Sequence, residues 1–138
     1  MSTAAATLSV RWERRWIGAL VGYLAVLAFI DTSAYLGIIP TKLAHVPYYD
    51  TFGHLFLIGL AGFFTHRAMA RRAVRVLGIA LPLGMLVVAT LAGIEELLQN
   101  LSPLRESSIW DFAADVVGIS AFGVVDAWLA RRRHQEET

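Results

Sequence analysis

The chain contains no cysteine among its 138 residues. Disulfide bonds, thiolate metal ligands and a cysteine nucleophile are therefore excluded, and redox chemistry gives no indication of the compartment. The sequence also lacks a glycine-rich phosphate-binding loop and a strip of basic and aromatic residues, the patterns that indicate nucleotide and nucleic-acid binding. It therefore gives no signal for a nucleotide, for haem or for a nucleic-acid partner.

Long apolar runs account for most of the chain, which is 57% hydrophobic and has a mean hydropathy of +0.57. Four runs stand out, at residues 16–39, 52–69, 76–94 and 109–129. Each approaches the roughly 20 residues that a helix needs to cross a bilayer, and the connections between them are too short to fold alone. We therefore predict an all-α integral membrane bundle of about four transmembrane helices, with residues 1–138 forming one domain in the lipid bilayer.

Basic residues divide unevenly between the connections. Ten of the 12 lysine and arginine residues precede the first run, lie at the end of the second run or between it and the third, or follow the fourth: Arg11, Arg14, Arg15, Arg67, Arg71, Arg72, Arg75, Arg131, Arg132 and Arg133. Only Lys42 and Arg105 fall in the other two connections. Because short connections rich in lysine and arginine stay in the cytoplasm, both termini are predicted to be cytoplasmic. The alternative to a first membrane span is that this run is a secretory signal peptide that is cleaved off, although the small-residue cleavage site near Thr32 is weak.

Asp50 and His54 stand four residues apart at the start of the second run. A helix places them on one face, where the carboxylate can orient or charge the imidazole. They form a candidate acid–base pair, with His54 as a catalytic residue and Asp50 as a binding residue. The structural alternative is that Asp50 caps the helix and His54 is a satisfied interfacial histidine.

Glu96 and Gln99 are three residues apart at the end of the third run, so they share a helix face. The C-terminal end of a helix disfavours a carboxylate by about 0.3–1 kcal/mol, so capping does not explain Glu96. We take Glu96 as catalytic and Gln99 as a binding residue. Glu95 points about 100° away on a helix and is expected to be solvated at the membrane surface, which is also the alternative for Glu96.

Asp111 and Asp115 are four residues apart on the fourth run, and Gly118 continues the same face. Asp111 has a structural explanation, because Ser108 and Asp111 occupy the first and fourth positions of a capping box. Asp115 lies deeper, inside apolar sequence, where a carboxylate is a functional candidate by default. We predict a catalytic role for Asp115 and a binding role for Asp111. Pairing of Asp115 with His54 or Arg105 for structure alone is the alternative.

The predicted topology brings the outer ends of the second, third and fourth runs to the same depth. The polar residues at these ends can then share one cavity: His54, Glu96, Gln99, Arg105, Asp111 and Asp115. Three carboxylates, one imidazole and one guanidinium can bind a divalent cation, carry out acid–base catalysis, or hold a phosphate or carboxylate through Arg105. With one histidine and no cysteine to act as ligands, this site suits a hard cation better than zinc. We expect Arg105 to pair with at least one of the carboxylates.

The spacing of these residues resembles a motif of the VanZ-like family of small bacterial membrane proteins. The motif runs through Glu96, Gln99, Arg105, Asp111, Asp115 and Gly118, at intervals of three, six, six, four and three residues. An earlier histidine motif of the family resembles Asp50 and His54, followed by the apolar run at 55–62, and the motif-bearing region is 50–122. Two positions depart from the family pattern: Thr51 stands where lysine is frequent, and Asp115 where asparagine is usual, which makes this site more acidic.

The resemblance implies a helical bundle in the bacterial cytoplasmic membrane and a link to the cell envelope. In the namesake branch that link is reduced susceptibility to teicoplanin-type lipoglycopeptides. We therefore expect an outward-facing polar site that binds or modifies an amphiphile, such as a lipid-linked cell-wall precursor or a lipid headgroup. A non-catalytic interaction or scaffold subunit is the first alternative. A small transporter that acts as an oligomer is the second, because four short spans leave little room for alternating access.

Overall fold

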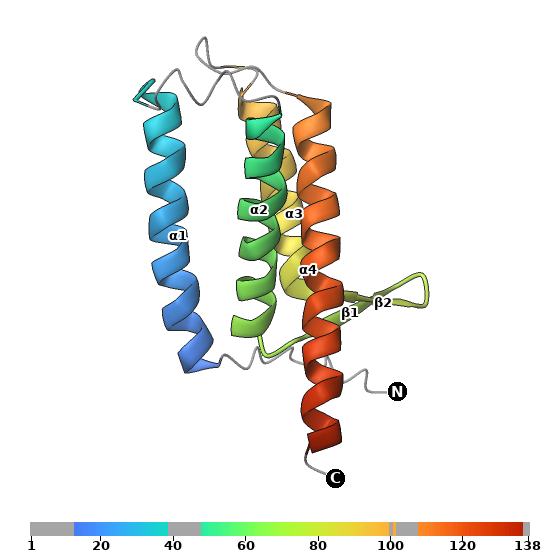
Figure 1. Ribbon diagram of the computed structural model, residues 1–138. Coiled ribbons are helices and arrows are strands. Elements are labelled where there is room, and N and C mark those ends of the chain that lie inside the picture. Colours follow the sequence, from blue (N-terminus) through green and yellow to red (C-terminus); the bar gives the residue numbers. More distant parts are fainter. Residues whose placement is uncertain (1–12, 39–47, 100, 102–107, 137–138) are drawn as a thin grey trace, which may run out of the picture.

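The computed structural model describes residues 13–38, 48–99, 101 and 108–136. Within them it has four helices and a β-hairpin: α1 (Arg14–Tyr35), α2 (Tyr49–Ala68), β1 (Ala73–Val76), β2 (Ile79–Pro82), α3 (Leu83–Gln99) and α4 (Ile109–Glu136). Successive helices run up and down beside one another, so α1 begins and α4 ends at the same end of the bundle (Figure 1). The predicted helical architecture is confirmed, with the hairpin as an addition.

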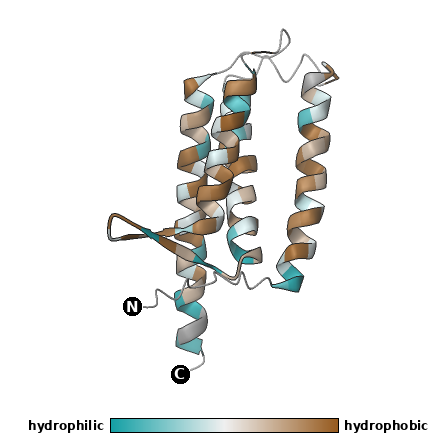
Figure 2. Ribbon diagram, turned by 180° about the vertical axis from the view of Figure 1, so that it is seen from behind, coloured by the Kyte–Doolittle hydropathy of each residue, from teal (hydrophilic) through white to brown (hydrophobic). Residues whose placement is uncertain are grey.

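Two of the described helices are long and apolar enough to cross a membrane, over Arg14–Ala34 and Ile109–Arg132. Apolar residues extend along the helices, and polar ones gather towards the helix ends (Figure 2). Large apolar side chains such as Val21, Val26 and Val124 are exposed on the outside of the bundle. Such outward apolar faces are unfavourable in water and indicate association with a membrane.

The third helix begins later than the sequence pattern predicts. The apolar run at 76–94 was expected to be one span, but its first residues form the second half of an antiparallel hairpin in which β1 pairs with β2. Leu77 and Gly78 make the turn, both at positive φ, as a two-residue hairpin turn requires. The 17 residues of α3 give about 25 Å of helix at ~1.5 Å per residue, less than the predicted span.

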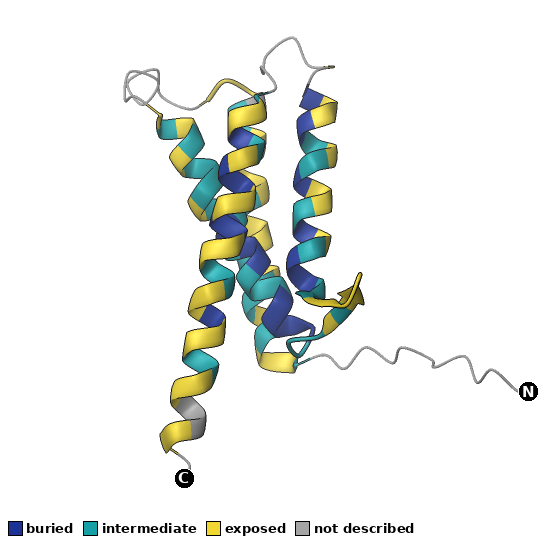
Figure 3. Cartoon of the chain, turned by 90° about the vertical axis from the view of Figure 1, so that its right-hand side faces the viewer, coloured by how far each residue is buried: buried dark blue, intermediate teal, exposed yellow. Residues whose placement is uncertain are grey.

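Small residues allow α2 and α4 to touch through their backbones. A Cβ atom added at Gly118 would overlap the carbonyl oxygen of Leu55, and one added at Gly59 would lie 2.8 Å from the Gly118 carbonyl carbon. Buried side chains of α2, α3 and α4 complete this core, including Ala61, Met85 and Ile119. Figure 3 shows buried residues concentrated on the inner sides of the helices. The closest helix contact therefore runs along α2 and α4.

The first helix is attached to α2 mainly through its N-terminal half. The ring of Trp16 packs edge-on against Phe63 at 6.0 Å between centroids, and Tyr23 lies 5.1 Å from Phe64. The Tyr23 hydroxyl donates a hydrogen bond to the Leu57 carbonyl oxygen at 2.5 Å. None of the described α1 side chains is fully buried within the chain. The C-terminal half of α1 borders a cavity.

We predict that Gly118→Ala lowers the free energy of unfolding by about 3 kcal/mol, because the new methyl group must push α4 away from α2. Denaturant unfolding in detergent micelles would measure the loss. Gly22→Ala is the matched control, since a Cβ atom there meets nothing within 4 Å, and it should leave stability unchanged or slightly higher. Equal stability of the two variants would contradict the importance of this contact.

Candidate functional site

Three predicted catalytic residues from three helices meet at the end of the bundle where α2 begins. His54 of α2, Glu96 of α3 and Asp115 of α4 place their ligand atoms within 4.8 Å of one another. His54 Nδ1 lies 3.1 Å from Asp115 Oδ1. Asp115 is 1% exposed and Glu96 7% exposed, so the carboxylates are withdrawn from solvent.

The contact between α2 and α4 positions this centre. Gly118 touches the backbone of Leu55, which directly follows His54, and Asp115 stands one helical turn before Gly118. Residues three or four apart lie on one helix face, so the approach at Gly118 brings the Asp115 carboxylate to the imidazole. Asp50, which spacing predicts to pair with His54, also has its carboxylate within 4.8 Å of the imidazole, and the hydrogen-bonded partner is Asp115 on another helix.

The capping role predicted for Asp111 is wrong, and the cap involves Glu96 instead. The Ser108 amide donates to Glu96 Oε2 at 3.1 Å, so the end of α3 supplies a carboxylate to the start of α4. A carboxylate at a helix N-terminus is favoured by the helix dipole. Asp111, which is buried, accepts a hydrogen bond from Thr51 Oγ1 at 2.9 Å. Both acidic residues therefore connect one helix to another.

Asp50 lies in the first turn of α2, where the N-cap position belongs to Tyr48. The side chain of Asp50 is exposed, and its carboxylate lies within 4.8 Å of the ligand atoms of His54 and Asp111. Asp50 is thus at the rim of the same polar region. The alternative in which it caps the helix is wrong.

Gln99 and Glu95 form a pair of their own at the end of α3. Gln99 Nε2 donates to Glu95 Oε1 at 3.0 Å, and Gln99 is 1% exposed. Glu95 is half-buried and borders a cavity, so the expectation that it is simply solvated is wrong. The remaining predicted binding residue, Arg105, lies outside the described residues, and its pairing with a carboxylate stays a prediction.

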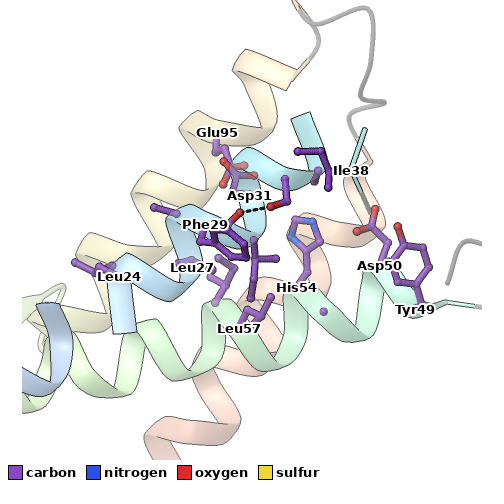
Figure 4. Close-up of a pocket in the computed structure, with 16 residues that line it drawn as sticks. Leu24, Leu27, Phe29, Asp31, Ile38, Tyr49, Asp50, His54, Leu57 and Glu95 are labelled. Atoms are coloured by element: carbon purple, nitrogen blue, oxygen red, sulfur yellow. Dashed lines mark hydrogen bonds between the residues drawn. The ribbon is translucent and has the colours of Figure 1, made fainter. Parts of the chain in front are cut away.

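A cavity of about 830 Å³ opens beside this centre, between α1 and α2. Its walls are mainly leucine, isoleucine, alanine and phenylalanine side chains, and its polar lining includes Asp31, Asp50, His54 and Glu95. Figure 4 shows the His54 imidazole between Asp31 and Asp50, with the apolar side chains of α1 along one side. Sequence reasoning did not select Asp31 as a site residue, although it is the acidic residue that interrupts the first apolar run.

This arrangement supports two kinds of chemistry. His54 uses Nδ1 in its hydrogen bond with Asp115, which holds the ring in position. The other ring nitrogen, Nε2, can then exchange a proton with a ligand in the cavity. The imidazole and the two buried carboxylates are also ligands that a divalent cation accepts. In both cases His54 is the link between the buried carboxylates and the cavity.

A second buried charge cluster lies towards the opposite end of the bundle, where sequence reasoning selected no site. Asp126 of α4 accepts hydrogen bonds from Arg67 of α2, and from Arg71 Nε at 2.9 Å. Asp126 and Arg67 are each 3% exposed. The sequence indicates that Asp126 lies on the same helix face as Asp115, because it stands 11 positions later, which is about three helical turns.

Comparison of the chain with family models, curated proteins and solved structures finds no match. The likeness to VanZ-like proteins therefore depends on the motif residues alone. Three of these residues, Glu96, Asp111 and Asp115, each place a carboxylate oxygen within 4.8 Å of a ligand atom of His54, whereas Gln99 is paired with Glu95. Of the residues predicted to share one cavity, His54 lines it, and Glu96, Gln99, Asp111 and Asp115 are not among its lining residues. The family assignment stays a proposal.

We predict that Asp126→Asn lowers the free energy of unfolding by about 3 kcal/mol, because it removes the negative charge that faces two arginines, one of them buried. Glu136→Gln, at an exposed position on the same helix, is the matched control and should have no effect. Thermal unfolding of both variants in the same detergent would measure the difference. Similar melting curves would show that the cluster does not hold α2 to α4.

Proposed function

We propose that the chain is a VanZ-like, multi-pass protein of the bacterial cytoplasmic membrane that binds or modifies an amphiphilic molecule at an outward-facing polar site. All four helices would cross the bilayer, with the start of α1 and the end of α4 at the cytoplasmic side. The basic residues at that end of the bundle and the acidic centre at the other support this orientation, since lysine and arginine favour cytoplasmic connections.

The observation that carries the proposal is that His54 faces an apolar cavity while it contacts a buried carboxylate. Ligand pockets of about 300–1,000 Å³ are typically apolar with a few well-placed polar groups, and the cavity beside α1 has this character. An amphiphile would place its hydrocarbon part along α1 and its headgroup at His54. A lipid-linked cell-wall precursor or a lipid headgroup has this chemistry.

Each polar residue has a distinct role in the proposed site. Asp115 orients the His54 imidazole, which gives or takes a proton at the headgroup. Glu96 fixes the start of α4 through the Ser108 amide and adds a second carboxylate. Gln99, Asp50 and Asp111 would shape the polar region, and Arg105 would bind a phosphate or carboxylate of the ligand. Through such a ligand the protein would affect susceptibility to lipoglycopeptides.

The proposed orientation predicts that both termini face the cytoplasm. A reporter that fluoresces only in the cytoplasm should therefore be active after Thr138. A reporter that requires export should be active when it is inserted in the connection that contains Lys42. The reverse pattern would move the His54 centre to the cytoplasmic side and contradict an outward-facing site.

The proposed chemistry predicts that Glu96→Gln and Asp115→Asn abolish complementation of a strain that lacks the protein. Each substitution keeps the size of the side chain and removes its charge, so membrane abundance should change little. His54→Ala should have the same effect. Asp111→Asn should act mainly through stability, by about 1 kcal/mol, because Asn can still accept from Thr51.

The readouts are lipid composition and antibiotic susceptibility, with membrane-inserted protein measured in parallel. Glu136→Gln controls for loss of an acidic charge from α4 outside the site. Full complementation by the Glu96 and Asp115 variants at equal abundance would rule out acid–base function and favour an interaction subunit.

A further inference from the structure

The centre formed by His54, Glu96 and Asp115 carries more negative charge than its described partners compensate. Two carboxylates that are each more than nine-tenths buried face one imidazole, which supplies at most one positive charge. In the described part of the chain, their hydrogen-bond partners are the Ser108 amide and His54. Buried charge is costly unless it is paired or coordinates a metal.

An orphaned oxygen provides a second, independent observation. Glu96 Oε2 accepts the Ser108 amide, whereas Glu96 Oε1 is buried and has no hydrogen-bond partner among the described residues. Buried carboxylate oxygens are rarely left without a donor, and one that is left so requires an explanation such as an ion. A metal ion at this position would satisfy the oxygen without any donor.

The spacing of the groups fits coordination of a metal. Ligands at about 2.1 Å from a metal lie about 3.0 Å apart when adjacent and about 4.2 Å apart when opposite in an octahedron. His54 Nδ1 and Asp115 Oδ1 are 3.1 Å apart, which is the adjacent spacing. The three ligand atoms lie within 4.8 Å of one another, so small side-chain rotations would bring all three onto one ion.

We propose that His54, Glu96 and Asp115 bind a divalent transition-metal ion, of the class that accepts both imidazole and carboxylate ligands, such as Mn²⁺. One nitrogen ligand argues against Ca²⁺ and Mg²⁺, which prefer oxygen alone, and the absence of thiolates argues against soft metals. Asp50, His54 and Asp111 form a second group of comparable spacing, but Asp50 is exposed and both groups need His54. The buried group is therefore the metal site.

Three protein ligands leave coordination positions open for a ligand. On the proposed function, on which this step rests, the headgroup of the amphiphile would carry a phosphate. A phosphate would be repelled by the Glu96, Asp111 and Asp115 carboxylates. A divalent cation removes this repulsion and can bind phosphate oxygens directly. The ion would thus convert an acidic pocket into one that accepts an anionic headgroup.

Direct metal binding tests the inference. The full-length protein in detergent is stripped with EDTA, dialysed and titrated with MnCl₂, and free Mn²⁺ is followed by electron paramagnetic resonance. We expect one saturable ion per chain, which Zn²⁺ displaces. Glu96→Gln and Asp115→Asn should each weaken binding at least tenfold, while Glu136→Gln should bind as the unaltered protein does. Helix content and thermal unfolding are measured for each variant to show that it is folded. Because two variants are used, the test still works if one of them fails to fold.

Absence of saturable binding, or equal binding by the Glu96 and Asp115 variants, would overturn the metal site. A second experiment separates this result from failure of the proposed function, with a polyprenyl phosphate as the probe and EDTA or Mn²⁺ in the buffer. Binding that is at least tenfold tighter with Mn²⁺ supports the metal site. Equal binding in both buffers overturns the role of the ion in headgroup binding and leaves the proposed function intact. Mn²⁺ binding without any binding of the amphiphile supports the metal site and counts against the proposed function.

Discussion

The backbone contact between α2 and α4 at Leu55 and Gly118 is the constraint on which the rest of the structure depends. No side chain fits between the two helices there, so their relative depth and rotation are set at that point. Asp115 then meets His54 on one side of the contact, and Asp126 meets Arg67 further along the same pair of helices. Both buried charge clusters follow from a single helix pairing.

The two clusters differ in ways that indicate different roles. The single carboxylate of Asp126 faces two arginines, one buried and the other partly exposed to solvent, so its negative charge is fully compensated and the cluster holds helices together. The His54 centre has two buried carboxylates and one imidazole, and it borders a cavity. A charge that is buried without full compensation costs stability, and proteins keep such groups mainly at functional sites. The incomplete cluster is therefore the one to which we assign ligand binding.

The first helix, α1, contributes to the cavity rather than to the polar centre. Its N-terminal half is attached to α2 by Trp16 and Tyr23, whereas its C-terminal half borders the cavity. The residues of the His54 centre come from α2, α3 and α4, whereas α1 supplies one wall of the cavity beside it. The polar centre thus depends on α2, α3 and α4, and the apolar part of the proposed site depends on α1.

Hydrophobic periodicity and helix-end chemistry in the sequence determined the helical class and the residues that gather at one end of the bundle. Only the tertiary structure decided which groups make hydrogen bonds: Asp115 with His54, Glu96 rather than Asp111 with the Ser108 amide at the start of α4, and Asp126 with Arg67. The hairpin before α3 was also missed, because β-branched residues in an apolar run are compatible with either a strand or a buried helix. Spacing along the chain determines on which face of its own helix a residue lies. Which residue it meets on another helix depends on the depth and rotation at which the two helices pack.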